Sequence, residues 1–329
     1  MRILVVGCGS IGKRHLGNLK LLSAGELIAF DTNYERLEEV KEKYNVKTFS
    51  NFEEAMQVRP DAVLVCAPTS LHMNYALVAA NSCCHLFIEK PLSHTIDGVD
   101  ELIEVASSNN LVLMVGCNFR FHWGLKMVKI FLDEGKIGKV ISARAEFGQY
   151  LPDWHPWEDY RQGYSAQQSL GGGIILDSIH ELDYLNWLLG EVKQVYCYSD
   201  KMSNLEINVE DVSEMIFCLE SKVIVSVHLD YIQRAYNRCL KIVAEEGTII
   251  WSYQDNLVKF YLAGEGRWQT LEKNAPYDVN EMYVEEMKHF LCCIDGKDSP
   301  IADGKEGKRV LEIALAAKES ARSSKVIFI

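Results

Sequence analysis

The sequence predicts an α/β protein with a doubly wound parallel sheet at the N-terminus and a second α/β domain with a large, mostly antiparallel open sheet. Short apolar runs alternate with helical patterns over the first 120 residues, and glycines in G-x-G-x-x-G spacing follow the first run. Beyond residue 120 the β-forming runs become longer and short turns join them. A chain of 329 residues is too long for one ordinary core. We therefore expect two domains, residues 1–120 and residues 121–329.

Five apolar runs predict the strands of the N-terminal sheet. Each is short and ends in glycine, proline or a polar residue, which is typical of parallel strands covered on both faces. The runs are residues 2–7, 26–31, 61–68, 84–91 and 111–118. Helical patterns connect them at residues 11–24, 33–44, 70–82 and 95–108. This strand–helix alternation predicts the parallel, doubly wound arrangement.

The rest of the chain predicts an antiparallel sheet with a few helices. A helical stretch at 121–134 is followed by β-forming runs at 139–150, 192–200, 209–219, 222–232, 237–246 and 247–262. A glycine-led helix is predicted over 174–189. A terminal helix is predicted over about 304–324, and we expect it to pack back toward the NAD-binding domain.

Composition excludes some classes of protein. The formal net charge of −12 argues against a nucleic-acid partner, which requires a basic face. Ten cysteines contain no C-x-x-C pair, so zinc-finger and thioredoxin-like sites are not expected. Cysteines in apolar runs behave as small buried residues and favour a reducing, cytoplasmic location. The apolar run after Met1 is too short for a membrane span, so we expect neither a signal peptide nor a membrane anchor.

The segment "VVGCGSIGKRH" predicts a dinucleotide-binding turn. Gly7 permits the tight turn, Gly9 lets a pyrophosphate approach the backbone, and Gly12 lets the helix pack close to the strand. Ser10 and Ile11 open the helix, whose N-terminus favours negative charge. The alternative is a glycine-rich turn without a ligand.

An acidic residue at the end of the second strand favours NAD over NADP. Asp31 follows Gly12 at the distance typical of the carboxylate that binds the ribose 2′-hydroxyl, and it would repel a 2′-phosphate. Arg36, further along the chain, can weaken that preference. The alternative role of Asp31 is to cap the next helix.

Polar groups follow the remaining strands at the edge where open α/β sheets bind ligands. Glu89, Lys90 and Pro91 end one strand, and Lys90 is expected to face the crevice rather than to be an ordinary solvated charge. A second cluster lies at the end of the predicted strand 61–68, and we expect it to contact the cofactor. The alternatives are that Thr69 caps the next helix and that His72 is a packing residue. The members of that cluster are Ala67, Pro68, Thr69 and His72.

Two further sets of residues are candidates for substrate binding. Asn118 and Arg120 follow a strand and are expected to face the crevice, with a surface arginine as the alternative. In the loop 150–169, Trp154 and Arg161 can cover a sugar ring or an anionic group. The alternative is that the aromatic rings of this loop pack between subunits or over the sheet.

The segment "SLGGGIILDSIHELDYLNWLLG" contains the most unusual pattern. Four ionisable groups, Asp177, His180, Glu181 and Asp183, lie in an otherwise apolar helix, where unpaired burial of charge is costly. Three of them recur at i, i+3 and i+6 and predict a slowly rotating polar strip, with Glu181 off its centre as an ordinary salt-bridge residue. A metal site built from the strip is conceivable, but no metal is predicted.

The motifs "GCGSIGKRH", "EKP", "GCNFR" and "GGGIILDSIHELD", in this order, resemble the Gfo/Idh/MocA (glucose–fructose oxidoreductase/inositol dehydrogenase) family over essentially the whole chain. The resemblance implies an NAD(P)-dependent dehydrogenase acting on CH–OH groups of a sugar, cyclitol or nucleotide-sugar, with NADP less favoured. It also implies that residues 1–120 bind NAD and that residues 121–329 bind substrate and form a homodimer or homotetramer through the C-terminal sheet. An NAD-dependent glycosidase or lyase that uses transient oxidation, or a non-catalytic NAD-binding sensor, is the alternative.

The resemblance also assigns roles to residues. Lys90 matches the family's lysine, and Asp177 and His180 match its aspartate and histidine; these three are the predicted catalytic residues. His180 is the expected general base, with Lys90 donating to the same substrate oxygen. The predicted cofactor-binding residues are Gly7, Gly9, Ser10, Ile11, Gly12, Asp31, Arg36, Ala67, Pro68, Thr69, His72, Glu89 and Lys90. The predicted substrate-binding residues are Asn118, Arg120, Trp154, Arg161, Asp177 and His180.

One departure from the family pattern leaves a question open. The family usually has three residues between the aspartate and the histidine, whereas "DSIH" has two. On a helix this changes the angle between the two side chains by about 100°. Asp177, Glu181 or Asp183 can therefore be the carboxylate that accompanies His180.

Overall fold

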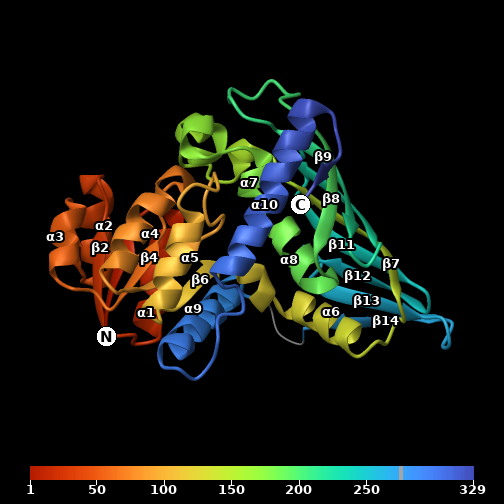
Figure 1. Cartoon of the computed structure of the whole chain (residues 1–329), viewed down its shortest axis with the longest axis horizontal. Helices are drawn as coiled ribbons and strands as arrows, with labels where there is room; N and C mark the ends of the chain where they lie inside the picture. The colour runs from red at the N-terminus through yellow and green to blue at the C-terminus, as the bar shows by residue number, and fades with distance from the viewer. Residues whose placement is uncertain (274–276) are drawn as a thin grey trace. The chain divides into compact units, whose positions relative to one another are not determined.

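The computed structural model describes residues 1–273 and 277–329, and they form two compact units (Figure 1). The first unit contains Met1–Asn118 and Val279–Arg309, and the second contains Phe119–Asp278 and Val310–Ile329. The segment Val279–Arg309 therefore joins the N-terminal residues although it lies late in the sequence.

A six-stranded parallel sheet forms the centre of the first unit, in the order β3-β2-β1-β4-β5-β6. Its strands are β1 (Arg2–Val6), β2 (Glu26–Phe30), β3 (Lys47–Phe49), β4 (Ala62–Val65), β5 (His85–Glu89) and β6 (Leu113–Gly116). Its helices are α1 (Ser10–Leu21), α2 (Tyr34–Tyr44), α3 (Phe52–Gln57), α4 (His72–Asn81), α5 (Val99–Ser108) and α9 (Asn280–Ile294). The order reverses direction beside β1, so the predicted doubly wound sheet is confirmed.

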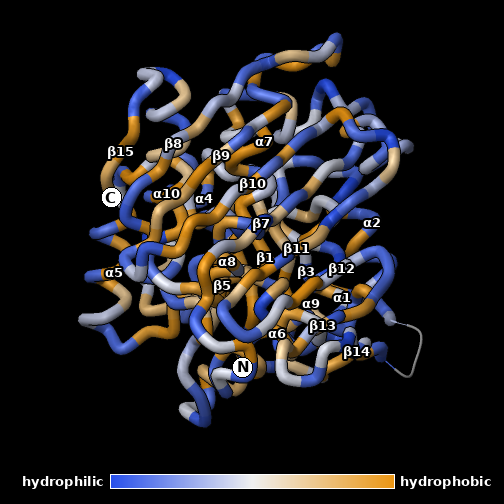
Figure 2. Tube along the Cα trace, turned by 90° about the vertical axis from the view of Figure 1, so that its right-hand side faces the viewer, coloured by the Kyte–Doolittle hydropathy of each residue, from blue (hydrophilic) through white to orange (hydrophobic). Residues whose placement is uncertain are grey.

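Continuous apolar sequence explains the central strands. The residues of β1 from Ile3 to Val6 and all of β4 are fully buried, as expected where helices cover both faces of a sheet. In Figure 2 the trace at β1 and β5 is hydrophobic along most of its length. The strand ends that carry the predicted cofactor residues are thereby held in one rigid layer.

Three elements of the first unit were not predicted from the sequence. β3 has three residues and α3 has six, too few for a clear periodicity. α9 has 15 residues, but a fully buried acid, Glu286, interrupts its apolar stripe. It packs beside α1, where the side-chain amides of Asn18 and Asn280 are bonded to each other.

A nine-stranded sheet dominates the second unit, in the order β14-β13-β12-β11-β7-β10-β9-β8-β15. Only β7 and β10 pair in parallel, so the predicted mostly antiparallel sheet is confirmed. Its strands are β7 (Val140–Gly148), β8 (Val192–Asp200), β9 (Val212–Leu219), β10 (Ile224–Asp230), β11 (Asn237–Ala244), β12 (Gly247–Ser252), β13 (Leu257–Leu262), β14 (Arg267–Glu272) and β15 (Ile327–Phe328).

The predicted single run at 247–262 is wrong, because it forms the hairpin β12–β13. Asn256 adopts a positive φ of 51° and donates its backbone N–H to the carbonyl of Tyr253, which reverses the chain. Asparagine tolerates this conformation better than most residues. β14, which follows, was not predicted.

Helices cover one face of this sheet. α6 (Trp123–Asp133) contacts β12 and β13, α7 (Ile174–Asp177) contacts β9 and β10, and α8 (His180–Leu189) contacts β7. α10 (Gly304–Ser323) is the last helix described, and its Ser320 hydroxyl accepts from the backbone N–H of Cys197 on β8. Alternate residues buried against the helices, such as Val227 and Leu240, give the sheet the expected period of two.

Among the described residues, no helix is long and apolar enough to cross a membrane.

Candidate functional site

The glycine-rich turn of the first unit has the steric properties that its motif predicts. Gly7 has a φ of +95°, and a Cβ there would lie 2.7 Å from the carbonyl oxygen of Cys66. A Cβ on Gly12 would lie 1.9 Å from the carbonyl oxygen of Gly7. Beside Gly9, the N-cap of α1, no described atom lies within 4 Å of a Cβ position. The turn is therefore close-packed at two glycines and open at the third.

Ser10 and Ile11 form the start of α1, which has no acidic residue in its first turn. The partial positive charge of this helix end is therefore not neutralised from within the helix, which suits an anion. The open space at Gly9 lies at the same end.

Asp31 is tied to the glycine-rich turn. Its Oδ2 accepts from the backbone N–H of Cys8 at 2.7 Å, and its Oδ1 accepts from the N–H of Asn33 at 2.8 Å. The alternative role as a helix cap is wrong, because Asn33 caps α2 with bonds to Glu35 and Arg36. The Arg36 guanidinium lies 3.9 Å from the Asp31 carboxylate, so a cation is present at the predicted ribose position.

His72 joins two of the strand-end segments. Its Nε2 lies 2.9 Å from the carbonyl oxygen of Ala67, and its Nδ1 lies 2.9 Å from that of Pro91. Burial lowers the pKa of this histidine. The segment between Ala67 and His72 includes Pro68 and Thr69. Thr69 does not cap the next helix, because the N-cap of α4 is Leu71 and makes no side-chain cap bond.

The E-K-P motif contains a contact that the sequence reasoning missed. The carboxylate of Glu89 lies 2.6 Å from Nε2 of His15, which projects from α1, and it also accepts from the backbone N–H of Lys90 at 3.2 Å. Both His15 and Glu89 are buried, whereas Lys90 is half-buried and precedes a cis proline, Pro91. The histidine stands three residues after Gly12, a position that could have been examined as part of the motif.

Asn118 is also buried in the first unit, where its amide donates to the sulfur of Met282 on α9 at 3.4 Å. The structure thus places Asn118 after the end of β6 and beside α9, which belongs to the segment Val279–Arg309. Its role in substrate binding stays a prediction.

In the second unit, the prediction of one helix over 174–189 is wrong. α7 ends at Asp177 and α8 begins at His180, because Ser178 has a ψ of 34° and leaves the helical conformation. The regular strip at i, i+3 and i+6 is therefore interrupted between the aspartate and the histidine. Almost all of α7 and α8 is buried, so these are core helices that carry charge.

Two tyrosine hydroxyls donate to Asp177. Tyr164, in the loop before the glycines, bonds to Oδ1, and Tyr231, after β10, bonds to Oδ2 at 3.0 Å. Asp177 is 3% exposed. Burial, followed by the charge of Asp177, raises the pKa of Tyr231 well above its ordinary value, so this hydroxyl keeps its proton. Tyr231 was missed, since nothing in the sequence links it to residue 177.

Glu181 is a fully buried partner of Arg238, which corrects its interpretation as an ordinary salt-bridge residue. The Arg238 guanidinium lies 2.7 Å from the Glu181 carboxylate and stacks over the rings of Phe119 and Phe147. Burial opposes the charge on Arg238, but Glu181 raises its pKa above the ordinary value. The Arg238 guanidinium therefore keeps its charge beside Glu181.

The Arg120 guanidinium donates to both carboxylate oxygens of Asp183, from Nη2 to Oδ1 at 2.7 Å and from Nε to Oδ2 at 3.2 Å. Arg120 is 1% exposed, so its alternative as a surface arginine is wrong. The fork-like geometry matches bidentate recognition of a carboxylate. Its predicted contact with substrate stays a prediction.

His180 is the first residue of α8, in ring contact with Phe119 at 4.9 Å, and it is 9% exposed. The structure therefore distributes the four ionisable groups among different environments rather than along one strip.

The loop before the glycines places its two candidate residues differently. The indole N–H of Trp154 donates to the carbonyl of Gln149 at 3.2 Å, and its ring packs against Tyr231. Arg161 is half-exposed and pairs with Asp159 at 2.8 Å and Glu206 at 2.9 Å. Among the described residues, no group of three or more histidine, cysteine or acidic side chains has a geometry that could hold a metal ion.

Comparison with protein families assigns both parts of the chain. Residues 1–117 match the Gfo/Idh/MocA oxidoreductase family with an NAD-binding Rossmann fold, and residues 125–250 match the C-terminal domain of the same family. The chain belongs to the Gfo/Idh/MocA family.

Individual relatives of this family agree with the assignment. The chain is 30% identical to the myo-inositol 2-dehydrogenase of Thermotoga maritima, over 97% of this chain and 96% of that protein. The solved structure of levoglucosan dehydrogenase in complex with NADH has a TM-score of 0.92 at 20% identity, covering 100% of this chain and 99% of that one. The Bordetella pertussis dehydrogenase WlbA, in complex with NADH and UDP-GlcNAcA, has a TM-score of 0.84 at 22% identity, covering 100% and 98%. As a Gfo/Idh/MocA protein, this chain is an oxidoreductase with an NAD-binding domain.

Proposed function

We propose that this protein is a dehydrogenase that transfers hydride between NAD and a hydroxyl-bearing carbon of a sugar or cyclitol. The observation that carries the proposal is the presence of a histidine at the start of α8 in a chain whose other unit has an NAD-binding turn. The relationship to a myo-inositol 2-dehydrogenase favours net oxidation over a hydrolase or lyase that uses NAD transiently.

The first unit fits NAD. The open space at Gly9 and the uncompensated N-terminus of α1 suit the pyrophosphate. Asp31, already oriented by the N–H of Cys8, would accept from a ribose hydroxyl. The strand-end residues Ala67 to Thr69 and Glu89 to Lys90 would surround the rest of the cofactor. When bound, NAD supplies the hydride acceptor, and the chain supplies binding and orientation.

The chain must also remove the hydroxyl proton. We assign this step to His180, which would accept the proton on a ring nitrogen while the carbon loses hydride. Lys90 would donate an N–H to the substrate oxygen and stabilise the charge that develops there. The match of Lys90 and His180 to the family motif supports these proposed roles.

Asp177 is the carboxylate that we assign to the substrate alongside His180. Glu181 is paired with Arg238, and Asp183 is paired with Arg120, so both serve buried ion pairs. Asp177 accepts from the hydroxyls of Tyr164 and Tyr231, and it matches the aspartate of the family motif, which supports this assignment. The role that we propose for Asp177 is to accept from a second substrate hydroxyl and thereby orient the ring.

The face of the second sheet that the helices leave open supports self-association. It carries exposed apolar side chains, which single chains seldom leave uncovered over a large area. They include Tyr196, Tyr198, Ile216, Ile224 and Trp268. We propose that this face forms the contact of a homodimer or homotetramer in the cytoplasm.

A substrate screen tests the proposed function. Purified protein is mixed with NAD or NADP and with sugars, cyclitols and nucleotide-sugars, and formation of the reduced cofactor is followed by its absorbance. We expect NAD-dependent turnover of at least one sugar or cyclitol. Failure of every compound with both cofactors would contradict the proposal.

Two variants then test the residue roles. His180→Ala should lower kcat about 10²–10⁴-fold, which is the usual contribution of general acid–base catalysis. Lys90→Ala should also lower kcat, and NAD binding measured by fluorescence should survive in the His180 variant. His155→Ala, a change of an exposed histidine, is the matched control. Undiminished kcat in His180→Ala over a range of pH would remove this residue from the mechanism.

A further inference from the structure

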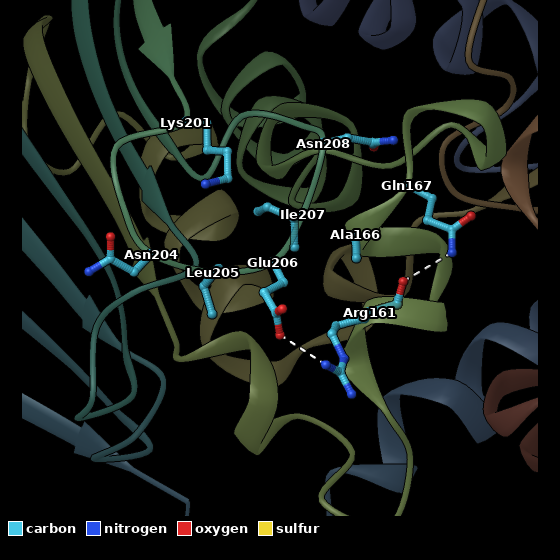
Figure 3. Close-up of a pocket in the computed structure, with 9 residues that line it drawn as sticks. All are labelled: Arg161, Ala166, Gln167, Lys201, Asn204, Leu205, Glu206, Ile207 and Asn208. Atoms are coloured by element: carbon cyan, nitrogen blue, oxygen red, sulfur yellow. Dashed lines mark hydrogen bonds and ion pairs between the residues drawn. The ribbon is translucent and has the colours of Figure 1, made fainter.

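A pocket of about 590 Å³ lies in the second unit, and among its described lining residues only Arg161 has been considered for a function above. Figure 3 shows it between the segments 161–167 and 201–208, the second of which follows β8. Its volume falls within the range of small-molecule sites, roughly 300–1,000 Å³. The polar lining residues are Arg161, Gln167, Lys201, Asn204, Glu206 and Asn208.

Hydrogen bonds between the two segments hold the walls of this pocket in place. Arg161 bonds to Glu206 at 2.9 Å, as the dashed line in Figure 3 shows, and the side chain of Asn208 accepts from the backbone N–H of Gln168 at 2.8 Å. The fully buried carboxylate of Asp211 accepts from two backbone N–H groups at the start of the second segment. Hydrogen bonds therefore fix the walls of the pocket, although both segments lie outside the strands of the sheet.

The charges of the pocket nearly cancel. Arg161 is bound by two carboxylates, those of Asp159 and Glu206, and its charge is therefore largely neutralised. The ammonium of Lys201 donates to the backbone carbonyl of Ser203 at 3.0 Å. A diphosphate carries at least two negative charges, and among the described lining residues only Lys201 has a cation that no carboxylate is shown to match, so this balance disfavours a diphosphate and favours an uncharged ligand.

The remaining lining matches a sugar ring. The amides of Gln167, Asn204 and Asn208 can each donate and accept, as sugar hydroxyls require. Leu205 and Ile207 add apolar surface of the kind that covers the C–H face of a pyranose. None of the described lining residues is aromatic, which disfavours stacking of a nucleobase.

The same loop connects this pocket to the site of Asp177. The carbonyl of Gln167 accepts from the N–H of Gly172 at 3.0 Å, and that of Ser165 accepts from Gly173 at 3.1 Å. The intervening Tyr164 donates to Asp177. We propose that the pocket is a subsite for a second, uncharged sugar unit linked to the ring that is oxidised. This inference rests on the proposed function and narrows its substrate class to glycosides and disaccharides.

Binding to the NADH-saturated protein tests the subsite without requiring turnover. Isothermal titration calorimetry compares D-glucose with cellobiose, myo-inositol with galactinol, and both pairs with UDP-glucose. We expect one disaccharide to bind at least tenfold more tightly than its single-ring counterpart. Gln167→Ala/Asn204→Ala should abolish that difference, whereas Gln57→Ala/Asn81→Ala, the same changes at exposed positions of the first unit, should preserve it. The single variant Asn204→Ala is titrated in the same way. It should reduce the preference for the disaccharide while leaving the 161–167 segment unchanged, which separates loss of a contact from a general loosening of the loop.

The possible outcomes separate the subsite from the proposed function. Equal affinity for single and double rings, or no binding of any probe, overturns the subsite. UDP-glucose binding that the double variant weakens also overturns it, because the occupant would then be a nucleotide. If glucose or inositol is oxidised without any preference for the second ring, the proposed function stands and the subsite falls. If a disaccharide binds through the pocket but no compound is oxidised, the subsite stands and the proposed function falls.

Discussion

The glycine-rich turn of the first unit and the three glycines before α7 in the second both bring backbone into close contact, but with different parts of the chain. At Gly12 the obstructing atom is the carbonyl oxygen of Gly7, within the same motif. At Gly173, which has a φ of +110°, the obstructing atom is a carboxylate oxygen of Glu210, far along the sequence. The constraint at Gly12 is local to the motif, although Gly7 in the same turn meets the carbonyl oxygen of Cys66. The constraint at Gly173 depends on how the second unit folds.

The charged groups of the two regions also differ in where their partners come from. Around the first turn the strand ends and α1 present their polar groups at one edge of a parallel sheet, as the topology requires. Around α7 and α8, each acid is matched by a partner from another element: Asp177 by tyrosines, Glu181 by Arg238 and Asp183 by Arg120. The second region is thus held by specific pairs, and changes to single residues should have different effects in the two regions.

The largest effect is expected from Gly12→Ala. The added Cβ would lie 1.9 Å from a backbone oxygen that has no room to retreat, so α1 must shift away from β1. We expect NAD affinity to fall by more than 100-fold and the melting temperature to drop by several degrees. Calorimetric titration of NAD and thermal unfolding measure the two effects.

Gly9→Ala sharpens this test, because a Cβ there meets no described atom within 4 Å. This variant should keep the wild-type melting temperature and still lose NAD affinity, if the pyrophosphate lies against Gly9. Wild-type NAD affinity in Gly9→Ala would show that the cofactor does not approach the backbone at this turn.

The next largest effect is expected from breaking the buried pair of Glu181 and Arg238. Arg238→Met leaves the Glu181 carboxylate without its cation, and loss of one partner of a buried pair costs about 3–5 kcal/mol of unfolding free energy. Urea denaturation measures this cost. Adding Glu181→Gln should recover much of it, because both charges are then gone. Equal stability of the single and double variants would contradict an ionised pair.

The contrast between the two regions also explains what could be predicted from the sequence. The parallel sheet, the glycine turn and the strand-end residues follow from patterns within a few residues of one another. The same holds for Asp31, whose distance from Gly12 is part of the motif. These are positions where the backbone geometry alone restricts the sequence.

The second region could not be predicted to the same depth. Apolar periodicity indicated one helix, but Ser178 breaks it, and no spacing rule anticipates that break. Of the partners of its charges, Arg238 lies on β11 and Tyr231 directly follows β10, and the fold of the sheet brings both to α7 and α8. His15 was missed for another reason: it projects from α1 and its partner Glu89 ends β5, so only the fold brings the two motifs together.

A smaller effect is expected from Lys318→Met on α10. Lys318 donates to both oxygens of Glu210, at 2.9 and 3.1 Å, and the backbone carbonyl of Glu210 accepts from the N–H of Ile174. Loss of the lysine should loosen the start of α7 and lower kcat a few-fold, while NAD affinity stays unchanged. Lys222→Met, on an exposed turn, is the control. A parallel loss of NAD affinity would indicate a general loss of structure instead of a local effect on α7.

The smallest effect is expected from His228 on the open face of the second sheet. Its ring nitrogens lie 2.9 Å from Asp230 on β10 and 2.7 Å from Glu214 on β9. The hydrogen bond to Asp230, followed in size by the opposing effect of burial and then by Glu214, raises the pKa of His228 to about 9. Since the folded-state pKa lies above the ordinary value of 6.5, the stabilisation is complete below that pH and is lost as the pH rises to about 9. His228→Gln should therefore lower the melting temperature at pH 6 and leave it unchanged at pH 10. A deficit of equal size at both pH values would mean that the ring acts by packing and that its charge contributes nothing.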